Sequence, residues 1–66
     1  MLIKVNGEHR EFEAPLNVLA LTEQLQLNPR QVAIERNCEI VPRSLYHEVM
    51  LDDGDAIEIV HFIGGG

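Results

Sequence analysis

The last six residues, HFIGGG, hold the groups of this sequence that are best suited to chemistry. Gly64, Gly65 and Gly66 have no side chains, so they offer only their backbone and the carboxylate of Gly66. A terminal carboxylate has a pKa near ~3.5 and is an anion at neutral pH. Such an anion can attack the α-phosphate of a nucleotide and give an acyl-adenylate, which is activated for transfer.

The glycine run can also supply reach. Glycine adopts nearly any φ and ψ, so the run can thread a narrow channel that a Cβ would block. Together with Ile63 it spans at most about 13 Å when extended. A glycine run is also typical of a frayed end or an expression scar. Its place directly after an apolar strand pattern favours a domain over residues 1–63 with a flexible tail, 64–66, that enters the active site of another protein.

Cysteine and histidine give weaker signals. Cys38 is the single cysteine, with no histidine near it, and a lone cysteine at a turn is more often a bystander than a nucleophile. His9, His47 and His61 lack metal-ligand spacing, so packed or solvated histidines are expected. His61 should face inward with Ile59 or lie at a strand end. We predict no catalytic residue and no metal site.

The remaining charged candidates cluster late in the chain. Asp52, Asp53 and Asp55 resemble a fragment of a calcium-binding loop, but its other ligands are missing, so a solvated turn is predicted. Arg43 follows Pro42 and fits either a surface contact or a surface ion pair. No phosphate-cradling loop occurs, so any ATP must bind to a partner, and we predict no bound cofactor.

Length and charge narrow the classes of function. A chain of 66 residues forms one small core with little room for a substrate pocket, which argues against a self-sufficient enzyme. The net charge of -6 repels nucleic acids and anionic membranes. A single cysteine fits a reducing compartment. Without an apolar run of about 18 residues or a signal peptide, a cytoplasmic protein is expected.

The fold that positions the tail is predicted to begin with a hairpin at the start of the chain. Residues Leu2 to Val5 are mostly apolar, with β-branched Ile3 and Val5 on one face, and Asn6-Gly7 is the strongest short signal for a type I′ turn. The second arm is predicted roughly from Glu8 to Glu13. A two-residue turn places Val5 beside Glu8 and Ile3 beside Arg10, and makes Phe12 the core residue of that arm.

One helix follows in the segment PLNVLALTEQLQL. Asn17 can cap it, and the Asn28-Pro29 pair is predicted to end it. One face of this helix would carry Val18, Leu21, Thr22 and Leu25.

Three further strands are predicted in QVAIERN, CEIV and AIEIVHF, with a tight turn or a short helix around Ser44 to Tyr46. A helix with one apolar face and a sheet with one apolar face bury both by packing together, which is an α+β arrangement. We expect a mixed sheet of four to five strands with one main helix on one face.

The alternation of the last strand predicts a docking surface. If Ile57 and Ile59 point into the core, Val60 and Phe62 point to the uncovered face. An exposed apolar patch on a small protein commonly marks a docking site, here Val60, Phe62 and Ile63. A one-residue shift of register would instead bury Phe62 and expose Ile63.

Several segments carry a family resemblance. In order, ERN, VPR, YHEV, DGDAIEIVHF and the final GGG resemble the ThiS family, the sulfur carriers of bacterial thiamin biosynthesis. The resemblance covers the whole chain. It implies a β-grasp (ubiquitin-like) fold, in which the last strand pairs parallel to the first in the middle of the sheet.

The resemblance also implies a chemistry. An E1-like adenylating enzyme (ThiF-like) would use ATP and magnesium to adenylate the carboxylate of Gly66, with Gly64 and Gly65 as the threading arm. A cysteine-derived persulfide, supplied indirectly by a cysteine desulfurase or another donor, would replace AMP and leave a thiocarboxylate. Thiazole synthase (ThiG-like) would take the sulfur. The carrier would be a reusable co-substrate and no enzyme, and its three glycines exceed the family's minimal two.

Three alternatives stay open. A sulfur carrier for molybdopterin or cysteine would use the same tail chemistry. A ubiquitin-like protein modifier would form isopeptide bonds to lysines. A plain interaction domain would not use its tail, so an alanine added after Gly66 should leave it fully functional and abolish the others.

Overall fold

The computed structural model describes residues 1–62, and its first hairpin forms as its turn residues dictate. Strand β1 (Leu2–Val5) pairs antiparallel with β2 (Glu8–Glu11) in the predicted register. Asn6 and Gly7 have φ values of 49° and 85°, which a type I′ turn requires. The second arm ends at Glu11, two residues before the predicted Glu13, because the last backbone bonds join Phe12 to Met1.

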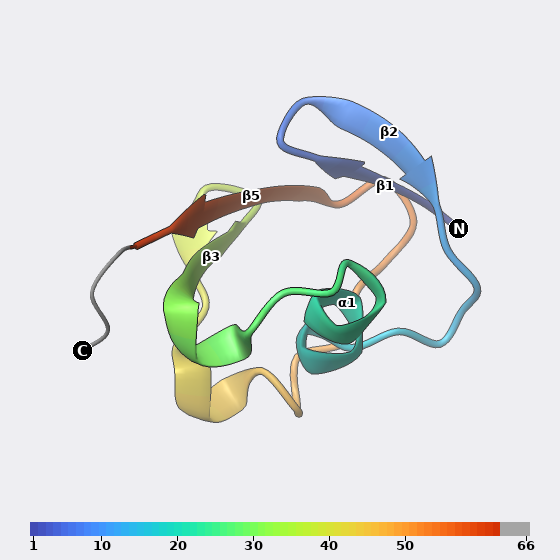
Figure 1. The fold of residues 1–66 in the computed structure, drawn as a ribbon. Helices are drawn as coiled ribbons and strands as arrows, with labels where there is room; N and C mark the ends of the chain where they lie inside the picture. The colour runs from blue at the N-terminus through green and yellow to red at the C-terminus, as the bar shows by residue number, and fades with distance from the viewer. Residues whose placement is uncertain (63–66) are drawn as a thin grey trace.

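The described residues form one mixed sheet of five strands. The three strands of the C-terminal half are β3 (Val32–Arg36), β4 (Glu39–Ile40) and β5 (Ala56–His61). The strand order is β2-β1-β5-β3-β4, so β5 lies in the middle, parallel to β1 and antiparallel to β3 (Figure 1). This order confirms the predicted β-grasp arrangement.

The single α-helix of the described residues, α1 (Val18–Gln24), packs on one face of this sheet. Asn17 caps it as predicted, its side-chain oxygen accepting from the N–H of Ala20 at 2.7 Å. The prediction that Asn28-Pro29 ends the helix was wrong. A Schellman turn stops it at Gln24 instead, with the N–H of Leu27 donating to the carbonyl of Thr22 at 2.9 Å.

A non-glycine residue makes this early stop hard to foresee. Gln26 has a φ of 61°, the left-handed conformation that the turn needs and that glycine usually supplies. The chain then continues through a short 3₁₀ helix, η1 (Pro29–Gln31), into β3.

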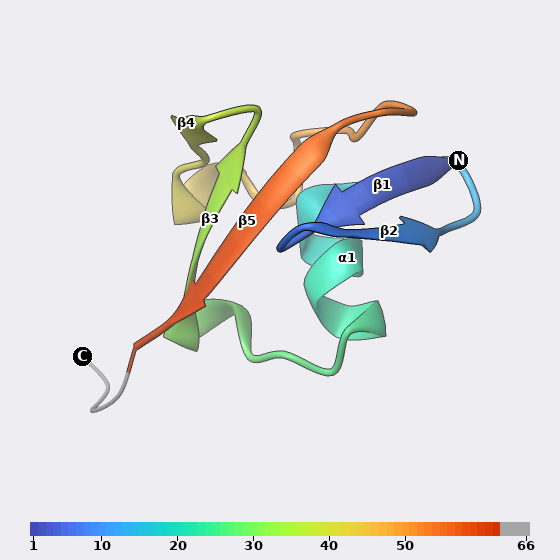
Figure 2. The same ribbon diagram turned by 90° about the horizontal axis from the view of Figure 1, so that it is seen from above.

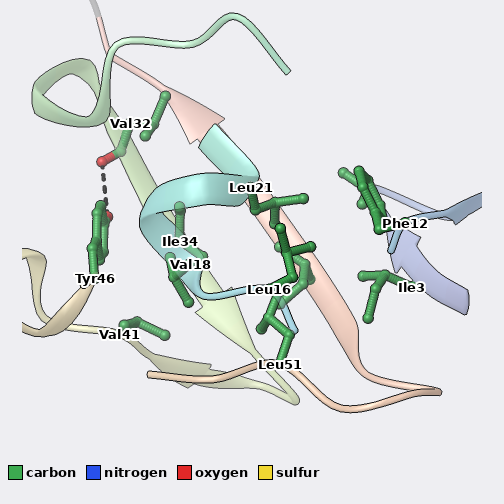
Figure 3. Close-up of a cluster of buried hydrophobic side chains, with 12 residues drawn as sticks. Ile3, Phe12, Leu16, Val18, Leu21, Val32, Ile34, Val41, Tyr46 and Leu51 are labelled. Carbon is green, nitrogen blue, oxygen red and sulfur yellow. Dashed lines mark hydrogen bonds between the residues drawn. The ribbon is translucent and has the colours of Figure 1, made fainter. Parts of the chain in front are cut away.

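The core fills the space between α1 and the sheet (Figure 3). Alternate positions of β1, β3 and β5 and one face of α1 supply part of it, as the apolar patterns predict, and the connecting segments supply the rest. Its buried apolar members are Ile3, Val5, Phe12, Leu16, Val18, Leu21, Val32, Ile34, Val41, Tyr46, Leu51 and Ile57. None of the helices in residues 1–62 is long and apolar enough to cross a membrane.

The connection from β4 to β5 is tied to the core by Tyr46. This residue follows a second 3₁₀ helix, η2 (Arg43–Leu45), and is buried. Its hydroxyl donates to the carbonyl of Val32 at 3.2 Å (Figure 3), and burial raises the pKa of this phenol. The bond holds η2 against β3, which fixes where Arg43 lies.

The acidic turn before β5 is not the solvated loop that the sequence suggests. Asp52 and Asp53 are exposed, but Asp55 is 6% exposed and accepts hydrogen bonds from Arg36 and Asn37. A carboxylate that faces a guanidinium and several N–H donors can be buried while charged. The turn therefore closes against the β3–β4 connection.

Candidate functional site

Strand β5 delivers the chain to the predicted tail. It is held on both sides, by β1 and β3, and crosses the molecule between them (Figure 2). Beyond the end of β1 the side chain of Asn6 continues the pairing. The N–H of Ile59 donates to its Oδ1 at 2.7 Å, and its Nδ2 donates to the carbonyl of Ile59 at 3.2 Å. These two bonds extend the contacts of β5 on the β1 side to Ile59.

The two faces of β5 differ as the alternation predicts. On the face that α1 covers, Ile57 is 1% exposed and Ile59 is partly buried against the core. Val60 is 61% exposed on the opposite face, which we call the outer face. Figure 2 looks onto this face, and no helix lies over β5 there. The predicted docking role of Val60 stays a prediction, but its side chain is available for it.

Phe62 follows β5 and keeps a fixed place. Its N–H donates to the carbonyl of Gln31 at 3.1 Å, which extends the pairing with the β3 side by one step. The guanidinium carbon of Arg43 lies 5.9 Å from the centre of the Phe62 ring, a cation–π contact. Phe62 remains 40% exposed, so the register shift that would bury it does not occur. Arg43 therefore contacts Phe62 at the surface, and it forms no ion pair within residues 1–62.

A row of three residues crosses the outer face beside Val60. Glu58 on β5 stands opposite Glu35 on β3, and Glu35 stands opposite Ile40 on β4. Ile40 is 65% exposed. The sheet thus places two carboxylates opposite each other, with the exposed apolar side chains of Ile40 and Val60 nearby.

The other chemical candidates are scattered. Cys38 is exposed in the turn between β3 and β4, with a φ of 71°. His9 lies on β2, His47 follows η2, and His61 is the exposed last residue of β5, opposite Val32. Residues 1–62 contain no group of three or more His, Cys, Asp or Glu that could hold a metal ion.

The predicted sites at Ile63, Gly64, Gly65 and Gly66 lie outside the described residues. Within the described residues, the sequence analysis missed two features. Asn6 was assigned only to a turn, and its bridge to Ile59 has no local signal because 53 positions separate the two residues. The pairing of Glu35 with Glu58 needs the register of β3 on β5, which alternation alone does not give.

Comparison with known proteins places these features in a family. The model of the ThiS family matches residues 3–66. The sulfur carrier protein ThiS of Bacillus subtilis is 41% identical over 66 residues, which cover 98% of this chain and 100% of that protein. A thiazole synthase of Paramagnetospirillum magneticum is 53% identical over 66 residues. These cover 100% of this chain and 20% of that synthase, so the chain spans about a fifth of its length.

A solved structure agrees with the fold. The crystal structure of a thiamine biosynthesis protein (ThiS) from Geobacter metallireducens superposes with a TM-score of 0.85 at 33% identity. The match covers 100% of both chains.

Proposed function

The chain belongs to the ThiS family, and we propose that it carries sulfur for the synthesis of the thiazole ring of thiamin. In this proposal the working group is the carboxylate of Gly66, at the end of the run that follows β5. The chain itself is a protein co-substrate, which partner enzymes load and unload. It needs no cofactor of its own, since ATP and magnesium are used by the adenylating partner.

The proposed loading has three chemical steps. The carboxylate of Gly66 attacks the α-phosphate of ATP on an E1-like enzyme, and pyrophosphate leaves. The outer sulfur of a persulfide then attacks the carbonyl carbon, and AMP leaves. A thiol cleaves the resulting acyl disulfide, which frees the thiocarboxylate. Gly64 and Gly65 pass through the narrow entry to each partner site because they have no Cβ.

Unloading gives the sulfur to thiazole synthase. A thiazole synthase of Paramagnetospirillum magneticum and one of Magnetococcus marinus each resemble this chain over about a fifth of their length. The resemblance favours a partnership between a domain of this kind and that activity. The proposal requires Gly66 to be the last residue of the mature protein, which the mass of the protein purified from its own organism will test.

Docking is assigned to the end of β5. Val60 and Phe62 are exposed apolar side chains directly before the tail, and Ile63 is proposed to continue the contact. A thiocarboxylate is a reactive sulfur, so a protein surface that selects its recipient prevents transfer to other acceptors. A rigid β5 then sets the distance from the docked surface to Gly66.

The match along nearly the whole chain to a sulfur carrier protein is the single observation that carries this proposal. The test is intact-mass analysis after incubation with the cognate adenylating enzyme, ATP, magnesium and a persulfide donor. The expected products are a species heavier by one adenylyl group and then one with a single oxygen replaced by sulfur. An unchanged mass with an enzyme that is demonstrably active would refute it. Stable isopeptide adducts with lysines would point to the protein-modifier function instead.

A further inference from the structure

The outer face of the sheet carries a pair of like charges. Glu35 and Glu58 stand directly opposite each other on antiparallel strands. Opposite side chains of such a pair have Cβ atoms about 4.5–5.5 Å apart, and like charges at this distance destabilise the sheet. Both residues lie on the face away from α1, because their neighbours Ile34 and Ile57 are buried beneath the sheet.

No cation within residues 1–62 forms an ion pair with either of these carboxylates. The ion pairs of the described residues are made by the N-terminus, Arg36 and His47, and none involves Glu35 or Glu58. Lys4 lies on the same face opposite Ala56, and it forms no ion pair there. The two carboxylates therefore remain available to a cation from outside.

The surroundings of the pair indicate the kind of cation. Ile40 is 65% exposed beside Glu35, and Val60 is 61% exposed two positions beyond Glu58. A small hydrated cation gains nothing from such apolar neighbours. An Arg or Lys side chain has an apolar stem and a charged head, so it can contact these side chains while its head meets both carboxylates. Arg fits best, because its planar guanidinium presents five donors to carboxylates.

We propose that the outer face docks a protein partner through an Arg or Lys that inserts its charged head between Glu35 and Glu58 while apolar atoms beside it cover Ile40 and Val60. This rests on the proposed function, in which partner enzymes dock at the end of β5, and the partner proposed here is the adenylating enzyme. The like charges then serve binding at the expense of the free domain's stability. They also attract a basic surface over a distance and speed association.

The test compares three purified chains for binding to the cognate adenylating enzyme by association kinetics at low and high salt. The chains are wild type, the double variant E35Q/E58Q, which keeps the shape of both side chains, and the control E23Q. Glu23 is an exposed carboxylate on α1, away from the outer face. The double variant should bind at least about tenfold more weakly at low salt, mainly through slower association, and should lose most of the salt dependence. E23Q should bind within twofold of wild type.

Urea unfolding of the same chains separates binding from folding. Removing the repulsion should leave the double variant at least as stable as wild type. Binding within twofold of wild type, an unchanged salt dependence or a clear loss of stability would overturn the inference. Adenylation of the wild-type chain is measured in parallel. If it fails, the proposed function fails; if it succeeds while E35Q/E58Q binds normally, only the docking inference does.

Discussion

Arg36 donates from its Nε to a buried oxygen of Asp55 at 2.8 Å, which joins the end of β3 to the turn that precedes β5. Two further donors meet this carboxylate, the N–H of Asp52 at 2.8 Å and the side-chain amide of Asn37 at 3.1 Å. Burial alone would raise the pKa of Asp55. The bonds from Asp52, Asn37 and Arg36, with the charge of Arg36, outweigh it and lower that pKa.

Stability should therefore fall in acid through Asp55. Because its pKa is lower in the folded state, its contribution is complete above the unfolded-state pKa of about 3.9 and is lost as the pH falls through the folded value. Urea unfolding of wild type and D55N across pH 7 to 2 measures this. D55N should be about 1–3 kcal/mol less stable at pH 7, and the difference should shrink in acid. Parallel curves for the two proteins would contradict the assignment.

The left-handed residue that stops α1 offers a stabilising change. Gln26 has a φ of 61°, and glycine adopts this conformation without strain. Gln26→Gly should raise the free energy of unfolding by up to about 1 kcal/mol. Gln24→Gly, two residues earlier and at the last position of α1, should instead lower it by up to about 1 kcal/mol. Chemical denaturation of both variants gives the comparison, and a loss of stability in both would rule out the strain argument.

The Asn6 bridge should be separable from the turn that Asn6 forms. Glycine tolerates the φ of 49° at this position but removes both side-chain bonds to Ile59. Asn6→Gly should cost about 0.5–1.5 kcal/mol and speed hydrogen exchange at the amide of Ile59. The amide of Phe62, which bonds to Gln31, is the internal control and should exchange at its former rate. Equal acceleration at both amides would show that β5 loosens as a whole.

Local chemistry explains how much of the fold the sequence predicts. Asn6-Gly7 sets the hairpin register, and alternation in β5 predicts which side Val60 faces. The misses are long-range. The burial of Asp55 depends on Arg36, 19 positions earlier, and no local pattern encodes that pair. The end of α1 was missed because Gln26 carries no turn signal of its own. At the site, the sequence predicts which side chains are exposed, but it does not predict which residues they contact.

The apolar contact at the end of β5 should matter for binding and little for folding. Val60→Ala and Phe62→Ala each remove exposed side-chain atoms, so unfolding midpoints should move little. Affinity for the adenylating enzyme should fall by roughly tenfold, as for a residue at the centre of an interface. Met50, which is exposed outside the five strands, provides the control M50A, with affinity expected to stay unchanged. If M50A weakens binding as much, the contact is not specific to β5.

Changes in the tail should distinguish the effect of the length of the glycine run from the effect of its missing side chains. Gly65→Val adds a branched Cβ at unchanged length, and an extra glycine inserted before Gly66 adds about 3.5 Å at unchanged width. If partner sites admit only a bare backbone, Gly65→Val should slow adenylation by about a hundredfold while affinity through β5 is kept.

Because the described core is built from residues 3–57, both tail variants should show wild-type circular dichroism. An alanine added after Gly66 tests the chemical end itself, since it moves the carboxylate one residue outward and places a Cβ beside it. Intact mass after a fixed time with enzyme and ATP measures all three. Normal loading of the alanine-extended chain would contradict a role for the Gly66 carboxylate. Normal loading of Gly65→Val alone would show that the entry is wide and that glycine supplies reach only.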